Sequence, residues 1–147
     1  MRAVLALLLC LGCISTNRAT LDETAALFHD DLRWGRLPAA ETAVDARARA
    51  AFQQHRRAWG SHVRVVDLDV DAVRAGRTTG ALRIRVTWTP GGDSTDVRES
   101  LVEEAWESTD GNWRLRGEAV IAGDPGLFTA PPATQAPAAP TDAGTAP

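Results

Sequence analysis

The chain has 147 residues, 44% of them hydrophobic, and a formal net charge of −3. This length is enough for one domain with a buried core. The 16 basic residues are all arginine and are outnumbered by 19 acidic residues, which excludes the strongly basic surface typical of nucleic-acid-binding proteins. Both cysteines lie within the first 13 residues, so no disulfide is expected in the rest of the chain.

The N-terminal segment has the features of a secretory signal peptide. Arg2 precedes an apolar run, residues 3–11, that is too short to span a bilayer. The run ends in Leu11-Gly12-Cys13, which resembles the lipobox of bacterial lipoproteins. That resemblance implies a signal peptide over residues 1–12, an acylated Cys13 and a lipid-anchored location in the cell envelope, and Ile14 favours the outer membrane. The alternative is an ordinary cleaved signal peptide and a periplasmic or secreted protein.

Residues 13–19 are expected to be a tether, and residues 20–123 a single domain. The first part of this domain has the apolar spacing of amphipathic helices, and Gly35 and Gly60 are typical helix stops. Three helices are therefore expected, over residues 20–34, 38–44 and 45–59. The inward stripe of the third helix is expected to be Ala48, Phe52, His55 and Trp59, with Arg47, Arg49, Arg56 and Arg57 elsewhere.

From Val66 onward the apolar period changes to two, which is typical of strands with one buried face. Asp110-Gly111, between two such runs, predicts a two-residue hairpin turn. Four antiparallel strands are therefore expected. Their inner face is expected to contain Val66, Leu68, Val70 and Ala72, then Leu82, Ile84, Val86 and Trp88, and then Ser100, Val102, Glu104, Trp106, Trp113 and Leu115.

The turn at Asp110-Gly111 also predicts the register, because directly opposed residues share a face of the sheet. Unbroken pairing of the last two strands gives the pairs Thr109/Asn112, Trp106/Leu115, Val102/Ala119, Ser100/Ile121, Glu107/Arg114, Ala105/Arg116 and Glu103/Glu118. The earlier strands are expected to pair as Val70/Ile84, Asp69/Arg85, Asp71/Arg83, Ile84/Val102, Leu82/Glu104 and Arg83/Glu103. The like-charged Glu103/Glu118 pair is unfavourable in this register, and Arg83 is expected to offset it.

Several segments carry a family resemblance. They are Phe28-His29-Asp30-Asp31-Leu32 with Trp34-Gly35, then Arg49 to Phe52, and then the hairpin from Val102 to Leu115. Together they resemble the NTF2-like (cystatin-like α+β, SnoaL-like) superfamily over residues 21–122. The resemblance implies an α+β fold in which three N-terminal helices pack on a curved four-stranded antiparallel sheet, forming a cone with a pocket. Members include isomerases, dehydratases, polyketide cyclases, transport factors and accessory domains, so the fold does not identify the function.

The pocket that this resemblance implies has six candidate lining residues: His29, His55, Trp88, Ser100, Glu104 and Trp106. Glu104 is the one ionisable residue that the register directs inward, and with His55 it could perform general acid–base catalysis. The alternative is a Glu104 that lies at the open end of the sheet, solvated or paired with an arginine. The superfamily's isomerases use an aspartate base with a tyrosine, and this chain has no tyrosine.

No metal or cofactor is expected. Asp67-x-Asp69-x-Asp71 resembles the start of a calcium-binding loop, but Ala72 stands where that loop needs glycine and Thr78 where it needs glutamate. The flanking alternation of aliphatic residues favours the face of a strand instead. Residues 124–147 are rich in proline, alanine and threonine, and we expect a disordered tail there.

These features favour a non-catalytic envelope lipoprotein whose domain binds a small apolar ligand or serves an accessory role. One alternative is a SnoaL-like isomerase or cyclase that uses Glu104 and His55, and another is a partner-binding module of an envelope assembly. The expected partners are the membrane, through Cys13, and a small apolar ligand, with no nucleic acid. The charged outer face predicts a monomer or weak oligomer, because it disfavours a hydrophobic sheet-to-sheet dimer.

Overall fold

A computed structural model describes residues 20–91 and 95–129. The expected signal peptide, Cys13 and the tether lie outside the described residues, as does the expected tail from residue 130 onward.

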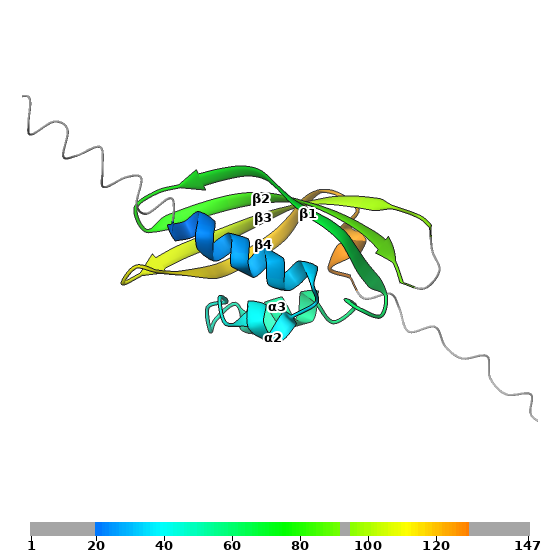
Figure 1. Ribbon diagram of the computed structural model, residues 1–147, viewed down its shortest axis with the longest axis horizontal. Helices are drawn as coiled ribbons and strands as arrows, with labels where there is room; N and C mark the ends of the chain where they lie inside the picture. The colour runs from blue at the N-terminus through cyan, green and yellow to red at the C-terminus, as the bar shows by residue number, and fades with distance from the viewer. Residues whose placement is uncertain (1–19, 92–94, 130–147) are drawn as a thin grey trace, which may run out of the picture.

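The helices precede the strands in the described chain (Figure 1). An N-terminal helix over residues 20–33 is followed by α2 (Leu37–Glu41) and α3 (Arg49–His55). The strands are β1 (Val63–Ala75), β2 (Thr79–Pro90), β3 (Arg98–Thr109) and β4 (Asn112–Gly123), followed by the 3-10 helix η1 (Pro125–Leu127). The sheet order is β1-β2-β3-β4 with antiparallel neighbours, so the chain has a small α+β fold.

The helix stop at Gly35 is confirmed, but the stop predicted at Gly60 is wrong, because α3 ends at His55 and Gly60 lies in the turn after it. Both α2 and α3 are shorter than predicted. Gly35 and Gly60 have φ values of 67° and 83°, which glycine adopts without strain. Between α2 and α3 the chain leaves the helical path to bond the edge of β4. Leu115 donates its N–H to the carbonyl of Ala43 (2.9 Å) and accepts from the N–H of Asp45 (2.9 Å). These long-range bonds to β4 replace helical bonds, which explains why α2 ends early and α3 begins late.

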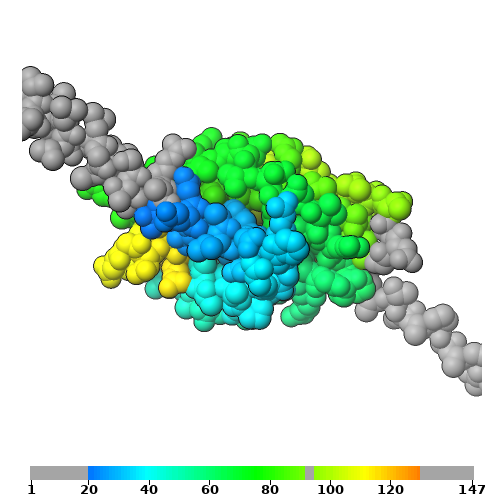
Figure 2. Space-filling model, viewed as in Figure 1, coloured from blue at the N-terminus to red at the C-terminus, as the bar shows by residue number. Residues whose placement is uncertain are grey.

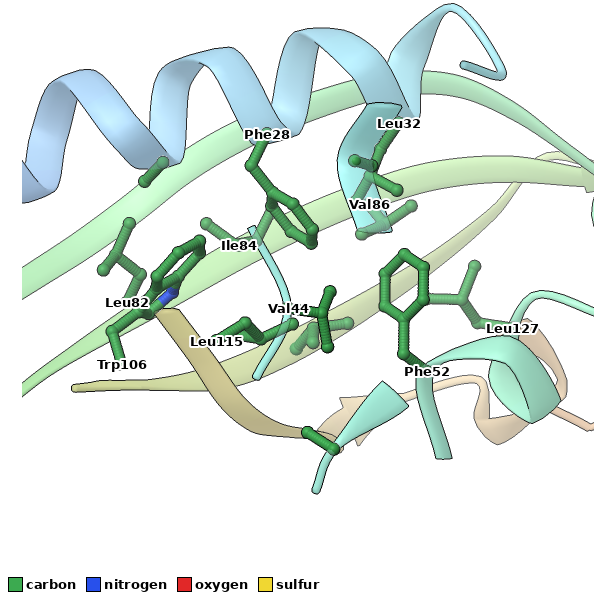
Figure 3. Close-up of a cluster of buried hydrophobic side chains, with 14 of the residues drawn as sticks. Phe28, Leu32, Val44, Phe52, Leu82, Ile84, Val86, Trp106, Leu115 and Leu127 are labelled. Carbon is green, nitrogen blue, oxygen red and sulfur yellow. The ribbon is translucent and has the colours of Figure 1, made fainter. Parts of the chain in front are cut away.

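The core lies between the helices and one face of the sheet (Figure 3). Phe28 of the N-terminal helix packs edge-on against Trp106 of β3, with ring centroids 5.3 Å apart, and lies 6.0 Å from Phe52 of α3. Trp88, Trp106 and Trp113 are all buried, as their inner-face positions predict. Trp34, in contrast, is 68% exposed at the end of the N-terminal helix.

The hairpin between β3 and β4 begins as predicted. Asp110 and Gly111 have φ values of 52° and 79°, and Thr109 pairs with Asn112. The pairs Trp106/Leu115 and Glu107/Arg114 are also confirmed. Positive φ at both central residues is what a two-residue turn of this kind requires.

Beyond Leu115 the predicted register is wrong, because the ladder has irregularities between Ala105 and Trp106 and between Leu101 and Val102. The observed pairs are Ala105/Gly117, Glu103/Ala119, Val102/Val120 and Ser100/Gly123, in place of the predicted Ala105/Arg116, Glu103/Glu118, Val102/Ala119 and Ser100/Ile121. A one-residue shift moves a side chain to the opposite face of a sheet. Glu118 therefore lies opposite Glu104, on the inner face.

Edge strand β1 shows the same effect. The pairs Val70/Ile84 and Asp69/Arg85 are confirmed, but a bulge after Val70 places Ala72 rather than Asp71 opposite Arg83. A second bulge after Val65 leaves Val66 unpaired with β2. Val66 and Val70 are each 53% exposed, so the predicted inward positions of both are wrong. The central pairs Ile84/Val102, Leu82/Glu104 and Arg83/Glu103 all match the prediction.

The predicted NTF2-like cone is wrong. Such a cone needs an open pocket between the helices and the sheet, and the interior space here is only about 10 Å³. Aromatic and aliphatic side chains from the helices and the sheet meet directly and fill the space where that pocket was expected (Figure 3).

Packed structure also continues past the predicted end of the domain at residue 123. Leu127 of η1 is fully buried, and its carbonyl accepts a hydrogen bond from the indole N–H of Trp59 (3.0 Å). The Asp124 side chain caps η1 by accepting from the N–H of Gly126 (2.7 Å). The disordered tail was expected to begin at residue 124, but residues 124–127 form a capped and packed turn.

Candidate functional site

The six candidate pocket residues lie in three separate groups rather than around one cavity. His29, Glu104 and Trp106 form one group, and Trp88 and Ser100 form another. His55 lies apart from both groups, against Glu118.

Glu104 links the N-terminal helix to β3. Its two carboxylate oxygens each lie 3.0 Å from Nε2 of His29, and Trp106 donates its indole N–H to Oε2 at 3.0 Å. The Glu104 side chain is only 3% exposed. Glu104 is therefore buried and hydrogen-bonded, and the alternative of a solvated carboxylate at the open end of the sheet is wrong.

The second buried carboxylate, Glu118, pairs with Arg56 at the end of α3. Both Nη atoms of Arg56 donate to the carboxylate, Nη2 to Oε2 at 2.7 Å and Nη1 to Oε1. Both side chains are buried, and this two-point contact is the strong form of an arginine–carboxylate pair. The β4 bulge makes the pair possible, because it turns Glu118 inward.

The Arg56 guanidinium also lies over three aromatic rings. Its Cζ is 4.3 Å from the ring centroid of Phe52, 4.8 Å from that of Trp59 and 5.1 Å from that of Phe128. Burial lowers the pKa of Arg56 to about 9, an effect that the negative charge of Glu104 opposes. The guanidinium therefore remains charged at neutral pH.

His55 contacts the outer side of this ion pair. Its Nδ1 lies 3.1 Å from Oε1 of Glu118, and its ring stacks on Phe128 with centroids 4.4 Å apart. Burial, and then the charge of Arg56, lower the pKa of His55 below its usual value. His55 thus pairs with Glu118, while Glu104 pairs with His29, so the two predicted acid–base partners each have a different neighbour.

The interior space beside these groups is too small for a ligand. It is lined by Arg56, Glu104 and Trp59 among others and leaves a volume of about 10 Å³. A volume of roughly 10–15 Å³ holds about one water molecule, whereas pockets for small ligands measure about 300–1,000 Å³.

The Trp88–Ser100 group is closed in the same way. Trp88 donates its indole N–H to Oγ of Ser100 (2.9 Å), and that hydroxyl donates to the carbonyl of Asp124 (2.6 Å). Arg98 lies over the Trp88 ring and donates to the Asp124 carboxylate at 3.0 Å. These bonds attach η1 to the end of the sheet.

A larger depression lies on the outside, where the end of the N-terminal helix meets the start of β1. We call it the surface groove; its volume is about 290 Å³. Figure 2 shows this face, with the N-terminal helix in blue and β1 in green. The lining residues are Leu32, Arg33, Gly35, Leu37, Trp59, Gly60, Val63, Arg64 and Val65.

Arg56 and Glu118 were missed as site residues in the sequence, although one signal pointed to them. The unbroken register placed Glu118 opposite Glu103 on the outer face, and that like-charged pair was unfavourable. In the structure the conflict is removed by the bulge, because Glu103 pairs with Ala119 and forms an ion pair with Arg83 across the outer face (3.7 Å).

The aspartates of β1 act as strand residues. Asp67 pairs with Arg33, and Asp71 pairs with Arg85 at 2.9 Å. Among residues 20–91 and 95–129, no three His, Cys, Asp or Glu side chains lie together as metal ligands would. No helix within the same residues combines the length and the apolar character that a membrane span needs.

Comparison with known proteins bears on the fold alone. No family model and no curated protein matches the chain. A solved structure that is similar is the solution structure of a SEC-C motif-containing protein from Rhodopseudomonas palustris, with a TM-score of 0.51 and 9% sequence identity. The match covers 64% of this chain and 73% of that chain. This likeness, together with the filled interior, supports a small α+β fold in place of the predicted cone.

Proposed function

We propose that this protein is an envelope lipoprotein, anchored through Cys13, whose domain is a binding or accessory module rather than an enzyme. The lipobox-like Leu11-Gly12-Cys13 supports the anchor. The domain would then lie close to a membrane surface, with the seven residues 13–19 as its tether.

The main support for a non-catalytic domain is that the interior acidic and basic groups contact one another. Glu104 contacts His29 and Trp106, and Glu118 contacts Arg56 and His55. A general acid or base must reach a substrate proton directly or through one water. Both carboxylates contact protein donors, and the interior space beside Glu104 is only about 10 Å³, so their role is to connect the helices to the sheet.

The anchor is tested by expressing the full chain in a bacterial host that is fed labelled palmitate. We expect the label on the wild-type protein and its complete loss in Cys13→Ser, which should accumulate as unprocessed precursor because no acyl acceptor remains. Cys10→Ser is the matched control and should keep the label. An unlabelled wild-type chain, or equal labelling of Cys13→Ser, would contradict the proposal.

A further inference from the structure

We propose that the surface groove binds an amphiphilic monocarboxylate, with its apolar chain on the groove floor and its carboxylate on Arg64. This inference specifies the ligand of the proposed binding module, and it depends on the proposed function only in that the domain binds a ligand. Nothing in the inference requires the lipid anchor.

The groove floor is apolar. Leu32 and Val63 are buried at its base, and Leu37, Trp59 and Val65 are partly buried around them. The volume of about 290 Å³ is close to the lower end of the range of roughly 300–1,000 Å³ for small-ligand pockets. These dimensions suit a single short or medium-length acyl chain.

The surface groove is open to solvent beside two turns, each of which contains a glycine. Gly35 and Gly60 both have positive φ, and a Cβ atom at either position would meet no atom within 4 Å. These glycines end the N-terminal helix and the segment after α3, so the backbone turns away there and leaves the groove uncovered.

The wall behind the groove is held in place by the core. Leu32 and Trp59 line both the groove and the small interior space, so they separate the two. Trp59 donates to the Leu127 carbonyl (3.0 Å), and the Arg56 guanidinium lies over its ring. The groove is therefore preformed, which reduces the entropy lost when a ligand binds.

The charges at the groove select the ligand's head group. Arg33 is already paired with Asp67. Arg64 is exposed and has no ion-pair partner in the part of the chain that the structure describes. One free guanidinium matches one carboxylate, whereas a phosphate monoester would bring a charge of about −1.5 to −2 to a chain whose net charge is already −3.

The test is equilibrium dialysis of labelled decanoate against the full chain carrying Cys13→Ser, so that no acyl chain of the protein competes. We expect saturable binding of decanoate and weaker binding of decanol. Because a charge-assisted hydrogen bond is lost, Arg64→Gln should raise the Kd for decanoate by about tenfold or more and remove the preference over decanol. Leu37→Trp, which fills the groove, should weaken both probes.

Arg74→Gln is the matched control, because Arg74 is another exposed arginine of β1 about 30 Å along the strand. Its Kd for decanoate should stay within about twofold of the parent, since a charge at that distance is screened by salt. No saturable decanoate binding, equal effects of the two arginine variants, or tighter binding of decyl phosphate than of decanoate would overturn the proposal. Failure of palmitate labelling would leave this result standing, so the two proposals fail separately.

Discussion

At the scale of single residues, the buried ion pair between Arg56 and Glu118 should be highly sensitive to substitution. Two carboxylates, Glu104 and Glu118, lie opposite each other in the core, and Arg56 is the arginine buried beside them. Removing one partner of a buried ion pair leaves an uncompensated charge in a medium of low dielectric constant. The outer-face pair Arg83–Glu103 lacks this dependence because water solvates both partners.

We therefore expect Arg56→Met to lower the free energy of unfolding by about 3–5 kcal/mol, measured by urea denaturation. Arg83→Met, the matched exposed control, should lower it by about 1 kcal/mol or less. The double variant Arg56→Met/Glu118→Met should recover much of the loss, because it leaves no unpaired charge. A double variant no more stable than Arg56→Met would show that the ion pair is not the cause.

Among the structural elements, the β3–β4 hairpin combines a locally specified turn with an irregular ladder. The turn requires positive φ at Gly111, and the irregularity between Ala105 and Trp106 directs Glu118 inward. The turn can be tested alone, because a Cβ atom at Gly111 would meet nothing within 4 Å. Any cost of adding a methyl group there must come from the backbone conformation.

Gly111→Ala should destabilise the protein by about 1–2 kcal/mol, the cost of left-handed backbone for a residue with a Cβ atom. Gly117→Ala, also in open space but without positive φ, should be neutral or stabilising by about 0.5–1 kcal/mol. The measurement is the urea midpoint at constant m-value. Equal effects of the two substitutions would mean that the positive φ at Gly111 does not contribute to the free energy of unfolding.

For the molecule as a whole, the helices and the sheet depend on the same buried polar network. His29, His55 and Arg56 come from the helical part, and Glu104 and Glu118 come from the strands. Changes of protonation within this network should therefore change the global stability rather than the order of one element alone.

Protonation of His55 should make the stability of the protein depend on pH. The pKa of His55 is lower in the folded state than in the unfolded chain, so the unfolded state binds a proton first as the pH falls. Stability should therefore be unaffected by His55 above about pH 6.5 and should decline as the pH falls from there to the folded-state pKa.

The check is the free energy of unfolding of the wild type and of His55→Gln between about pH 7.5 and pH 5, a range that spans the usual histidine pKa of about 6.5. The wild type should lose more stability than His55→Gln across this window. His62→Gln, at an exposed position, controls for the removal of a histidine. A wild type that loses less stability than His55→Gln would reverse the assigned sign.

The amino-acid sequence determined the features that depend on a few neighbouring residues. Gly35 ends the N-terminal helix and Asp110-Gly111 forms a hairpin turn, because positive φ is a local requirement at these positions. The period of two placed Trp88, Trp106 and Trp113 on the buried face, because alternation follows from strand geometry alone.

The tertiary structure decided the features that depend on distant contacts. The bulges of β1 and β4, the pairing of the Ala43–Asp45 segment with Leu115 and the burial of Leu127 each join residues far apart in the chain. Such contacts override local preference because the free energy of packing and hydrogen bonding exceeds that of local propensity. For this reason the partners Glu118 and Arg56, and the filled interior, became visible only in the folded chain.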